Sequence, residues 1–324
     1  MRRRSHSVAI TTCQCEFLAW SPVATSPRQS AAKPSARWSA ISSLVLLLIA
    51  GGAVAHAGWN LLLKRIGSST PTVLWWINLV GAVLITPLGI ATLAAADFEW
   101  NWILLAGLCG VFEVVYFLLL QRGYRDGDVS LVYPLARGTG PTLSVLGAIL
   151  ILGERPSLVA LIGVAVIIAG IGVISTAGSR TGTRAPLSSV LYGLGVGVMI
   201  ACFTVWDGWA VGTLGLPPIG YFWMALVVQA ILFTPFAIRG RNCVSTFRAH
   251  PVIITAIGLL GPASYMLALT AIQLSSVSLV APARESSVIL VALGGAIFFG
   301  EKHVVQRVIG SLVVVAGVAL LAVG

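Results

Sequence analysis

Residues 129–134 read VSLVYP, and residues 277–282 read VSLVAP. A Gly-Glu pair follows each copy at nearly the same interval, as Gly153-Glu154 after the first and as Gly300-Glu301 after the second. Matches that recur at a fixed distance along a chain indicate an internal duplication. The sequence therefore predicts two related units that are offset by roughly 147 residues.

Further matches at the same offset define the extent of these units. They are Gly163 with Gly310, Gly170 with Gly317, and Trp59-Asn60 with Trp206-Asp207. We divide the chain into a basic tail of residues 1–40, a first unit of residues 44–177 and a second unit of residues 187–324, joined near residues 182–186. The tail lacks the continuous apolar core of a signal peptide. We expect it to be disordered, or to result from a start site that is assigned too early.

The composition excludes an ordinary soluble domain. Hydrophobic residues make up 57% of the chain and charged residues 9%, with a mean hydropathy of +0.97. A soluble domain carries about 25% charged residues, so most of this surface must face a lipid bilayer. The net charge of +10 is spread over the tail and many short connections. We therefore expect no nucleic-acid partner.

Apolar runs of about 20 residues mark helices that are long enough to cross a bilayer. We predict ten such spans, which makes the fold an all-α integral membrane protein. In the first unit they cover residues 44–63, 71–93, 102–121, 129–152 and 158–176. In the second unit they cover residues 189–211, 218–238, 252–274, 277–299 and 304–323.

An odd number of spans in each unit has a topological consequence. After five crossings the second unit must enter the membrane from the side opposite the first. The two units are then related by a pseudo-two-fold axis in the membrane plane, which is the 5+5 inverted-repeat plan of many secondary transporters. The 35 glycines fit this interpretation, because small residues let membrane helices approach closely where lipid supplies no hydrophobic drive.

Polar side chains inside the spans are the candidate functional residues, because a charge at mid-bilayer costs about 2.5–3.5 kcal/mol on insertion scales. His56, Asn60 and Lys64 recur every four residues and form one polar stripe on the first span. One interpretation makes this stripe part of a substrate path. The other is a hydrogen-bonded interhelical histidine next to a lysine that extends to the membrane interface.

Two carboxyl groups are further candidates. Glu113 lies near the middle of the third span, with Tyr116 on the same helical face. Such a carboxyl group suits proton coupling, because intramembrane acidic residues often form proton relays. The alternative is a carboxylate that a structural arginine neutralises. Asp207, the counterpart of Asn60, is a second carboxylate that a pathway could contain.

The duplication places Arg137 and Glu285 at equivalent positions, three residues after Pro134 and Pro282 respectively. These opposite charges could pair near the pseudo-two-fold axis, or could face a cavity together with Arg284. A buried pair can also be purely structural. Because proline bends or breaks helices, we expect helix breaks at both prolines, and matched breaks point to a binding site near the midplane.

Several classes of site have no support in the sequence. It contains no G-x-x-x-x-G-K-[ST] phosphate loop, no H-E-x-x-H zinc motif and no G-x-S-x-G nucleophile elbow. The five cysteines are scattered without a metal-binding or disulfide spacing. We therefore expect no cofactor, no metal site and no enzymatic activity.

Taken together, these signals resemble the drug/metabolite transporter superfamily, EamA type, with two EamA repeats. The resemblance rests on HAGWN at residues 56–60, on VSLVxP followed by Gly-Glu, and on Gly163 or Gly310 in the closing helix of each unit. It implies ten helices in an inverted repeat around a central cavity. It also implies transport of small metabolites or toxic compounds, often outward and often by proton or substrate exchange.

Membrane orientation stays open, because two indications disagree. The loops on the side opposite the N-terminus hold nearly all of the loop lysines and arginines, and the positive-inside rule then places both termini outside. The resemblance implies cytoplasmic termini. We expect a multi-pass protein of the plasma membrane, and the sequence leaves oligomeric state, substrate and transport direction undetermined.

The leading hypothesis is a secondary active transporter that moves a small metabolite or drug-like solute by alternating access, with coupling to protons or to exchange as options. Its expected polar lining is His56, Asn60, Glu113, Tyr116, Arg137, Asp207, Arg284 and Glu285. The alternative is a non-transporting multi-span assembly or receptor protein, which predicts paired polar groups and no continuous cavity. An intramembrane enzyme would need two catalytic groups around one pocket.

Overall fold

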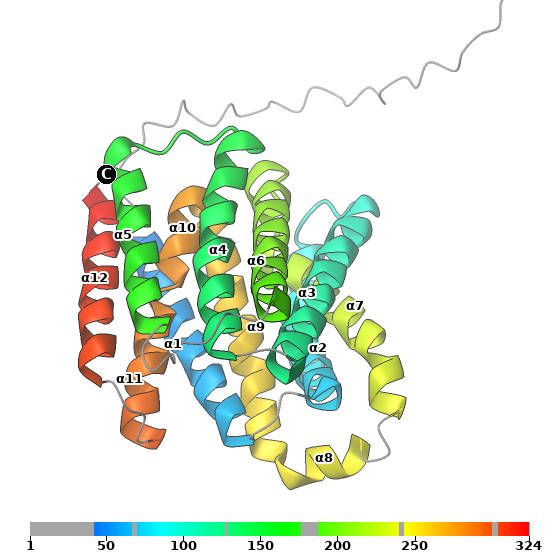
Figure 1. Ribbon diagram of the computed structural model, residues 1–324. Coiled ribbons are helices and arrows are strands. Elements are labelled where there is room, and N and C mark those ends of the chain that lie inside the picture. Colours follow the sequence, from blue (N-terminus) through cyan, green and yellow to red (C-terminus); the bar gives the residue numbers. More distant parts are fainter. Residues whose placement is uncertain are drawn as a thin grey trace, which may run out of the picture. The chain divides into compact units, whose positions relative to one another are not determined.

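The computed structural model describes residues 42–66, 70–126, 129–175, 187–239, 243–299 and 304–323. Within these ranges every regular element is a helix (Figure 1). The elements are α1 (Ser43–Ile66), α2 (Pro71–Ala94), α3 (Asn101–Asp126), α4 (Val129–Leu150), α5 (Leu158–Ser175), α6 (Leu187–Asp207), the π-helix η1 (Gly208–Thr213), α7 (Pro218–Arg239), α8 (Cys243–Ala249), α9 (Pro251–Leu274), α10 (Val277–Arg284), α11 (Ser287–Phe299) and α12 (Val304–Val323). The predicted tail, the joint between the units and the second Gly-Glu pair lie outside the described residues.

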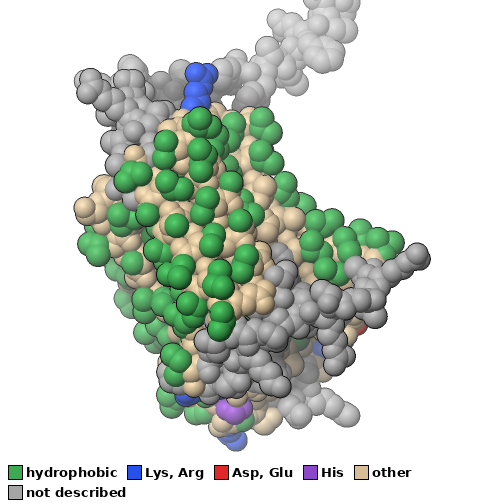
Figure 2. Space-filling model, turned by 60° about the vertical axis from the view of Figure 1, so that its left-hand side comes forward, with side chains coloured by type: hydrophobic (Ala, Val, Ile, Leu, Met, Phe, Trp, Pro, Cys, Tyr) green, Lys and Arg blue, Asp and Glu red, His purple; other side chains and the backbone are tan. Residues whose placement is uncertain are grey.

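The outer surface of this helical assembly is apolar. Within the described ranges six helices are long and apolar enough to cross a membrane, namely α1, α2, α3, α6 together with η1, α7 and α9. Shorter apolar helices run over Leu158–Ile174 and Val308–Leu321. Leu47, Leu104 and Leu150 are 70%, 76% and 80% exposed, and Figure 2 shows a face covered largely by hydrophobic side chains. This part of the chain is an all-α, multi-pass integral membrane protein.

The ninth predicted span consists of two helices. α10 ends at Arg284 and α11 begins at Ser287. Between them the backbone N–H groups of Glu285 and Ser286 donate to carbonyl oxygens three residues earlier, at 3.0 and 3.1 Å. This tighter bonding ends the α-helical ladder, so Glu285 lies at an interruption rather than on a continuous helix.

In the first half, by contrast, α4 continues through Pro134 without interruption, so the helix break expected there is wrong. Pro134 is the sixth residue of the 22-residue helix α4, and Pro282 is the sixth residue of the eight-residue helix α10. In α10 the break comes after the proline, where Ser286 and Ser287 provide a sequence that favours a new helix start.

Helices of one half pack chiefly against helices of the other. α1 packs on α9, α2 on α7, α4 on α6 and α5 on α12. The pattern persists when each helix is replaced by its counterpart in the other half. The contact of α3 with α6 corresponds to that of α9 with α1, and the contact of α3 with α7 corresponds to that of α9 with α2. Likewise α4 contacts α6 as α11 contacts α1. A pseudo-two-fold relation between the halves produces such reciprocal contacts.

The contact between α5 and α12 shows the same reciprocity at single residues. A Cβ atom added to Gly163 would lie 2.9 Å from the carbonyl oxygen of Gly317, and one added to Gly317 would lie 2.8 Å from that of Gly163. Gly170 and Gly310 face each other in the same way, at 2.9 Å in both directions. Gly163 thus meets the counterpart of Gly170, and Gly170 meets the counterpart of Gly163. The backbones of α5 and α12 can touch at these points because glycine has no side chain.

This close approach predicts that Gly170→Ala lowers the free energy of unfolding by about 1–3 kcal/mol, the usual range for overpacking. The new methyl group would lie 2.7 Å from Cγ2 of Val314 and 2.9 Å from the carbonyl oxygen of Gly310. Gly172→Ala is the matched control, since a Cβ atom there meets nothing within 4 Å and alanine favours the helix. Unfolding in mixed detergent micelles measures both, and equal stabilities for the two variants would contradict the packing.

The first Gly-Glu pair connects one half of the chain to the other. Gly153 has a φ of +70°, a left-handed conformation that glycine adopts without strain. The turn brings Glu154 to the N-terminus of α10, where Oε1 accepts a hydrogen bond from the Val277 N–H at 2.7 Å and Oε2 accepts one from the Ser278 N–H at 2.8 Å. A carboxylate at this helix end satisfies free N–H groups and complements the helix dipole.

Candidate functional site

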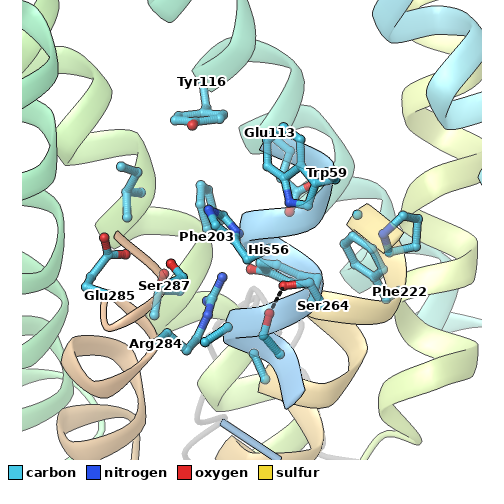
Figure 3. Close-up of a pocket in the computed structure, with 18 of the residues that line it drawn as sticks. His56, Trp59, Glu113, Tyr116, Phe203, Phe222, Ser264, Arg284, Glu285 and Ser287 are labelled. Atoms are coloured by element: carbon cyan, nitrogen blue, oxygen red, sulfur yellow. Dashed lines mark hydrogen bonds between the residues drawn. The ribbon is translucent and has the colours of Figure 1, made fainter. Parts of the chain in front are cut away.

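The two halves enclose a central cavity with a volume of about 160 Å³. Its walls come from α1, α2, α3, α4, α6, α7, α9, α10 and the start of α11. Most of the surface is apolar, and Figure 3 shows aromatic and polar side chains gathered around it. The aromatic members are Trp59, Tyr116, Phe117, Phe203, Phe222 and Tyr265. Phe222 stacks on Tyr265 with ring centroids 4.5 Å apart.

The polar stripe of α1 divides between two spaces. His56 lines the central cavity, and its ring meets the ring of Trp59 edge-on at 5.1 Å. Its Nε2 atom is buried and has no hydrogen-bond partner in the part of the chain that is described. Asn60 lines a second, smaller cavity, and its Nδ2 donates to the His56 carbonyl oxygen at 2.7 Å. Lys64 lies beyond both, exposed near the end of the helix.

Arg137 and Glu285 form an ion pair across the two halves. Arg137 Nη1 lies 2.8 Å from Glu285 Oε2, and the side chains are 16% and 13% exposed. Both residues line the central cavity. The Arg137 guanidinium also lies 5.4 Å from the ring centroid of Tyr133. The sequence left open whether the two charges pair or face a cavity, and the structure places them so that they do both.

Arg284 precedes this pair and lies differently. Its side chain points toward the middle of the cavity (Figure 3), with the guanidinium 4.8 Å from the ring centroid of Tyr265. Among the described residues it has no hydrogen-bond or ion-pair partner. The ring contact is a cation–π interaction, which supplies partial compensation for the charge.

Asp207 is buried behind this ring and is not part of the cavity lining. Its side chain is fully buried at the junction of α6 and η1. Oδ2 accepts a hydrogen bond from the Tyr265 hydroxyl at 2.5 Å, and Oδ1 accepts one from the Tyr221 hydroxyl at 2.7 Å. The carboxylate is thus hydrogen-bonded to the cavity lining through Tyr265.

Glu113 lines the cavity from α3 and is 6% exposed. Its Oε2 accepts a hydrogen bond from Gln229 Nε2 of α7 at 2.6 Å. Gly110 makes this contact possible, because a Cβ atom there would lie 3.0 Å from the carbonyl oxygen of Ala225. The close approach of the two helices brings the carboxylate to an amide donor instead of an arginine. The neutralising arginine considered for Glu113 is therefore not its hydrogen-bond partner.

The second cavity has a volume of about 110 Å³ and adjoins the first. Trp59, Tyr116 and Arg137 line both spaces. Asn60, Tyr124 and Tyr133 line only the second one, which lies toward the ends of α1 and α3 and the start of α4. The aromatic rings of Trp59 and Tyr116 thus lie along the boundary between the cavities.

Six of the eight predicted site residues line the central cavity, with Asn60 in the second cavity and Asp207 behind Tyr265. Sequence reasoning missed Gln229, Asn78 and Tyr265. Gln229 and Asn78 are each the single amide side chain of an apolar helix, a signal that was available. Tyr265 gave no such signal, because tyrosine is common in membrane helices.

The chemistry of this arrangement is that of a binding site. Within the described ranges there is no group of three or more His, Cys, Asp or Glu side chains that could hold a metal ion. The cavity lining combines the Arg284 guanidinium, the His56 imidazole and aromatic rings, and groups of these kinds fix the orientation of small ligands in protein pockets.

Comparison with known proteins finds a matching family and similar solved structures. The profile of the EamA-like transporter family matches residues 43–176 and 187–323. A solved structure titled only "Crystal structure of protein" is similar, with 18% sequence identity and a TM-score of 0.67 over 85% of this chain and 95% of that one. At this identity the likeness shows the fold alone. No curated protein matches the sequence.

Proposed function

The chain belongs to the EamA-like transporter family, and on this premise we propose that it is a secondary active transporter that moves a small solute by alternating access. The observation that carries the proposal is the central cavity. It lies between the two halves, contains charged side chains from both, and combines them with aromatic walls. Sites of this kind near the midplane of a repeat interface are typical of secondary transporters.

We propose ten spans in an inverted 5+5 arrangement, with α10 and α11 together forming the ninth. The reciprocal helix contacts support this count, because they relate each helix of the first half to one of the second. Figure 1 adds that α4 passes into α5 at the end of the bundle marked by the C-terminus, whereas α11 ends and α12 begins at the opposite end. The corresponding connections of two inverted units lie on opposite sides of a membrane.

In this mechanism the halves rock about the solute bound in the cavity. The second cavity extends the path toward the side on which α1 and α3 end. A non-transporting assembly protein would need neither a cavity nor a guanidinium that lacks a partner among the described residues. The Arg137–Glu285 pair alone would suit such a protein, so the proposal rests on the space that surrounds the pair. We also propose the plasma membrane as the site of action.

Flux through proteoliposomes tests this function. Purified protein is first screened by thermal shift against amino acids, nucleosides, sugars, organic cations and organic anions, and stabilising compounds are then tested as radiolabelled substrates for uptake and counterflow. We expect saturable counterflow of at least one ligand, with empty liposomes as the control. A ligand that binds in the cavity yet never crosses the bilayer would favour the receptor alternative.

Side-specific labelling tests the architecture independently. The five native cysteines are replaced by alanine, and single cysteines are introduced at Glu154 and at Glu301. A membrane-impermeant maleimide should then label the two positions from opposite faces of the membrane. Labelling of both from one face would rule out the inverted arrangement, whatever the flux assay gives.

A further inference from the structure

The carboxylates around the central cavity already have hydrogen-bond donors. Glu285 pairs with Arg137 at 2.8 Å, and Glu113 accepts from Gln229 at 2.6 Å. Asp207 is separated from the cavity by a tyrosine ring, and both of its oxygens accept hydroxyl groups. A ligand cation would therefore compete with an existing partner at every one of these carboxylates.

The donors of the cavity are in the opposite position. Arg284 carries five N–H groups, and none of them bonds to a described residue. The amide of Asn78, which also lines the cavity, makes no hydrogen bond within the described ranges. His56 Nε2 is buried without a partner and can donate in one imidazole tautomer. These donors have no acceptor among the described residues, and a ligand that carries acceptor oxygens would satisfy them.

The charge of Arg284 strengthens this conclusion. An ionised group in a membrane interior is costly unless it is paired or faces water. The ring of Tyr265 lies 4.8 Å from the guanidinium and offers a cation–π contact. This contact uses none of the N–H groups of Arg284 as hydrogen-bond donors to an acceptor oxygen. An anionic group with two oxygens fits this fork, because guanidinium and carboxylate can bond in a bidentate manner.

The size and walls of the cavity limit the rest of the ligand. Its volume is about 160 Å³, and an apolar cavity of about 150 Å³ in another protein holds one benzene molecule. Phe203, Phe222 and Tyr265 surround this space and favour a flat apolar group by stacking. One ring bearing one carboxylate therefore matches both the volume and the polarity.

We propose that the central cavity selects small organic monoanions with one flat apolar group, and that Arg284 binds their carboxylate. The inference rests on the proposed transport function and narrows its substrate class. Arg284 acts as the anion-binding group, and Asn78 and His56 provide further hydrogen-bond donors close by.

Calorimetry with three compounds of nearly equal shape tests the proposal: benzoate, benzyl alcohol and benzylamine. They differ in charge and share one ring. The full-length protein in detergent is expected to bind benzoate at least tenfold more tightly than either of the others. Benzylamine or benzyl alcohol binding as tightly as benzoate would overturn the proposal, and this comparison needs no variant protein.

Variants then assign the preference to one residue. Arg284→Gln is expected to reduce benzoate affinity at least tenfold, to the level of benzyl alcohol, while benzyl alcohol binding changes little. Arg284→Lys should keep part of the preference, since it keeps the charge but loses the fork. Arg239→Gln is the matched control, because it removes an exposed arginine at the end of α7. An unchanged preference in Arg284→Gln would overturn the assignment.

Binding and flux separate this inference from the function on which it rests. Benzoate that binds with the expected preference but shows no counterflow would contradict the transport proposal and leave the anion site intact. Counterflow of a cation or a neutral solute, without any preference for benzoate, would support transport and overturn the anion site.

Discussion

Glu285→Gln is expected to abolish transport and to lower the free energy of unfolding by about 3–5 kcal/mol, the usual cost of removing one partner from a buried ion pair. The variant leaves Arg137 charged, 16% exposed and without its carboxylate. The loss should be large because this pair joins α4 of the first half to the break between α10 and α11 in the second. Reversible unfolding in detergent measures stability, and counterflow in proteoliposomes measures transport, which should fall at least a hundredfold.

The double variant Arg137→Gln/Glu285→Gln separates the two effects. It removes the stranded charge, so most of the lost stability should return, while transport should stay low because this pair of charges no longer faces the cavity. Asp126→Asn is the matched control, since it breaks an exposed pair with Arg125, and such surface pairs contribute little. If the single and the double variant proved equally unstable, the stranded charge of Arg137 would not be the source of the lost stability.

The duplication in the sequence predicted more of the site than any single motif. It identified Arg137 and Glu285 as equivalent positions, and the structure brings their side chains to 2.8 Å. It also matched Gly163 and Gly170 with Gly310 and Gly317, which form the reciprocal contact between α5 and α12. Across a pseudo-two-fold axis a residue on the axis meets its own counterpart, and two residues off the axis each meet the counterpart of the other. A repeat found in a sequence therefore carries information about contacts.

Other features depended on tertiary packing and could not be read from the sequence. Pro134 and Pro282 occupy equivalent places, yet only the second precedes a helix break. Asp207 was placed in the pathway because it corresponds to Asn60, but two tyrosines from α7 and α9 enclose it. No local pattern reveals which buried carboxylate receives its donors from a distant helix. The fold class followed from composition, whereas these partners followed from which helices become neighbours.

α10 is held at both ends by side chains of the first half. Glu154 accepts the N–H groups of Val277 and Ser278 at its start, and Arg137 pairs with Glu285 immediately after its end. This short helix belongs to the second half in sequence but is bound to the first half by charge-assisted hydrogen bonds, which are stronger than neutral ones. In the proposed rocking motion α10 either moves with the first half or releases both contacts, and the break at Glu285 and Ser286 is where it would part from α11.

Glu113→Gln is expected to abolish gradient-driven accumulation while leaving counterflow measurable. Glutamine keeps the size of the side chain and an oxygen that can accept from Gln229, which lies 2.6 Å from the carboxylate. It removes the only cavity carboxyl group whose described hydrogen-bond partner is neutral, and therefore the group best placed to take up and release a proton. One pH unit corresponds to about 1.4 kcal/mol per proton, so one coupled proton sustains roughly a tenfold concentration ratio.

The assay is uptake into proteoliposomes with an inside–outside difference of one pH unit and with the membrane potential clamped. The wild-type protein should approach the tenfold ratio, and the variant should stop at equal concentrations on both sides. Glu99→Gln serves as the matched control, because Glu99 is exposed in the connection before α3. This variant should accumulate solute as the wild type does. Accumulation by Glu113→Gln at the wild-type ratio, with the same dependence on the gradient, would remove Glu113 from proton coupling. Loss of both accumulation and counterflow would assign it instead to solute binding or to folding, which the unfolding assay then distinguishes.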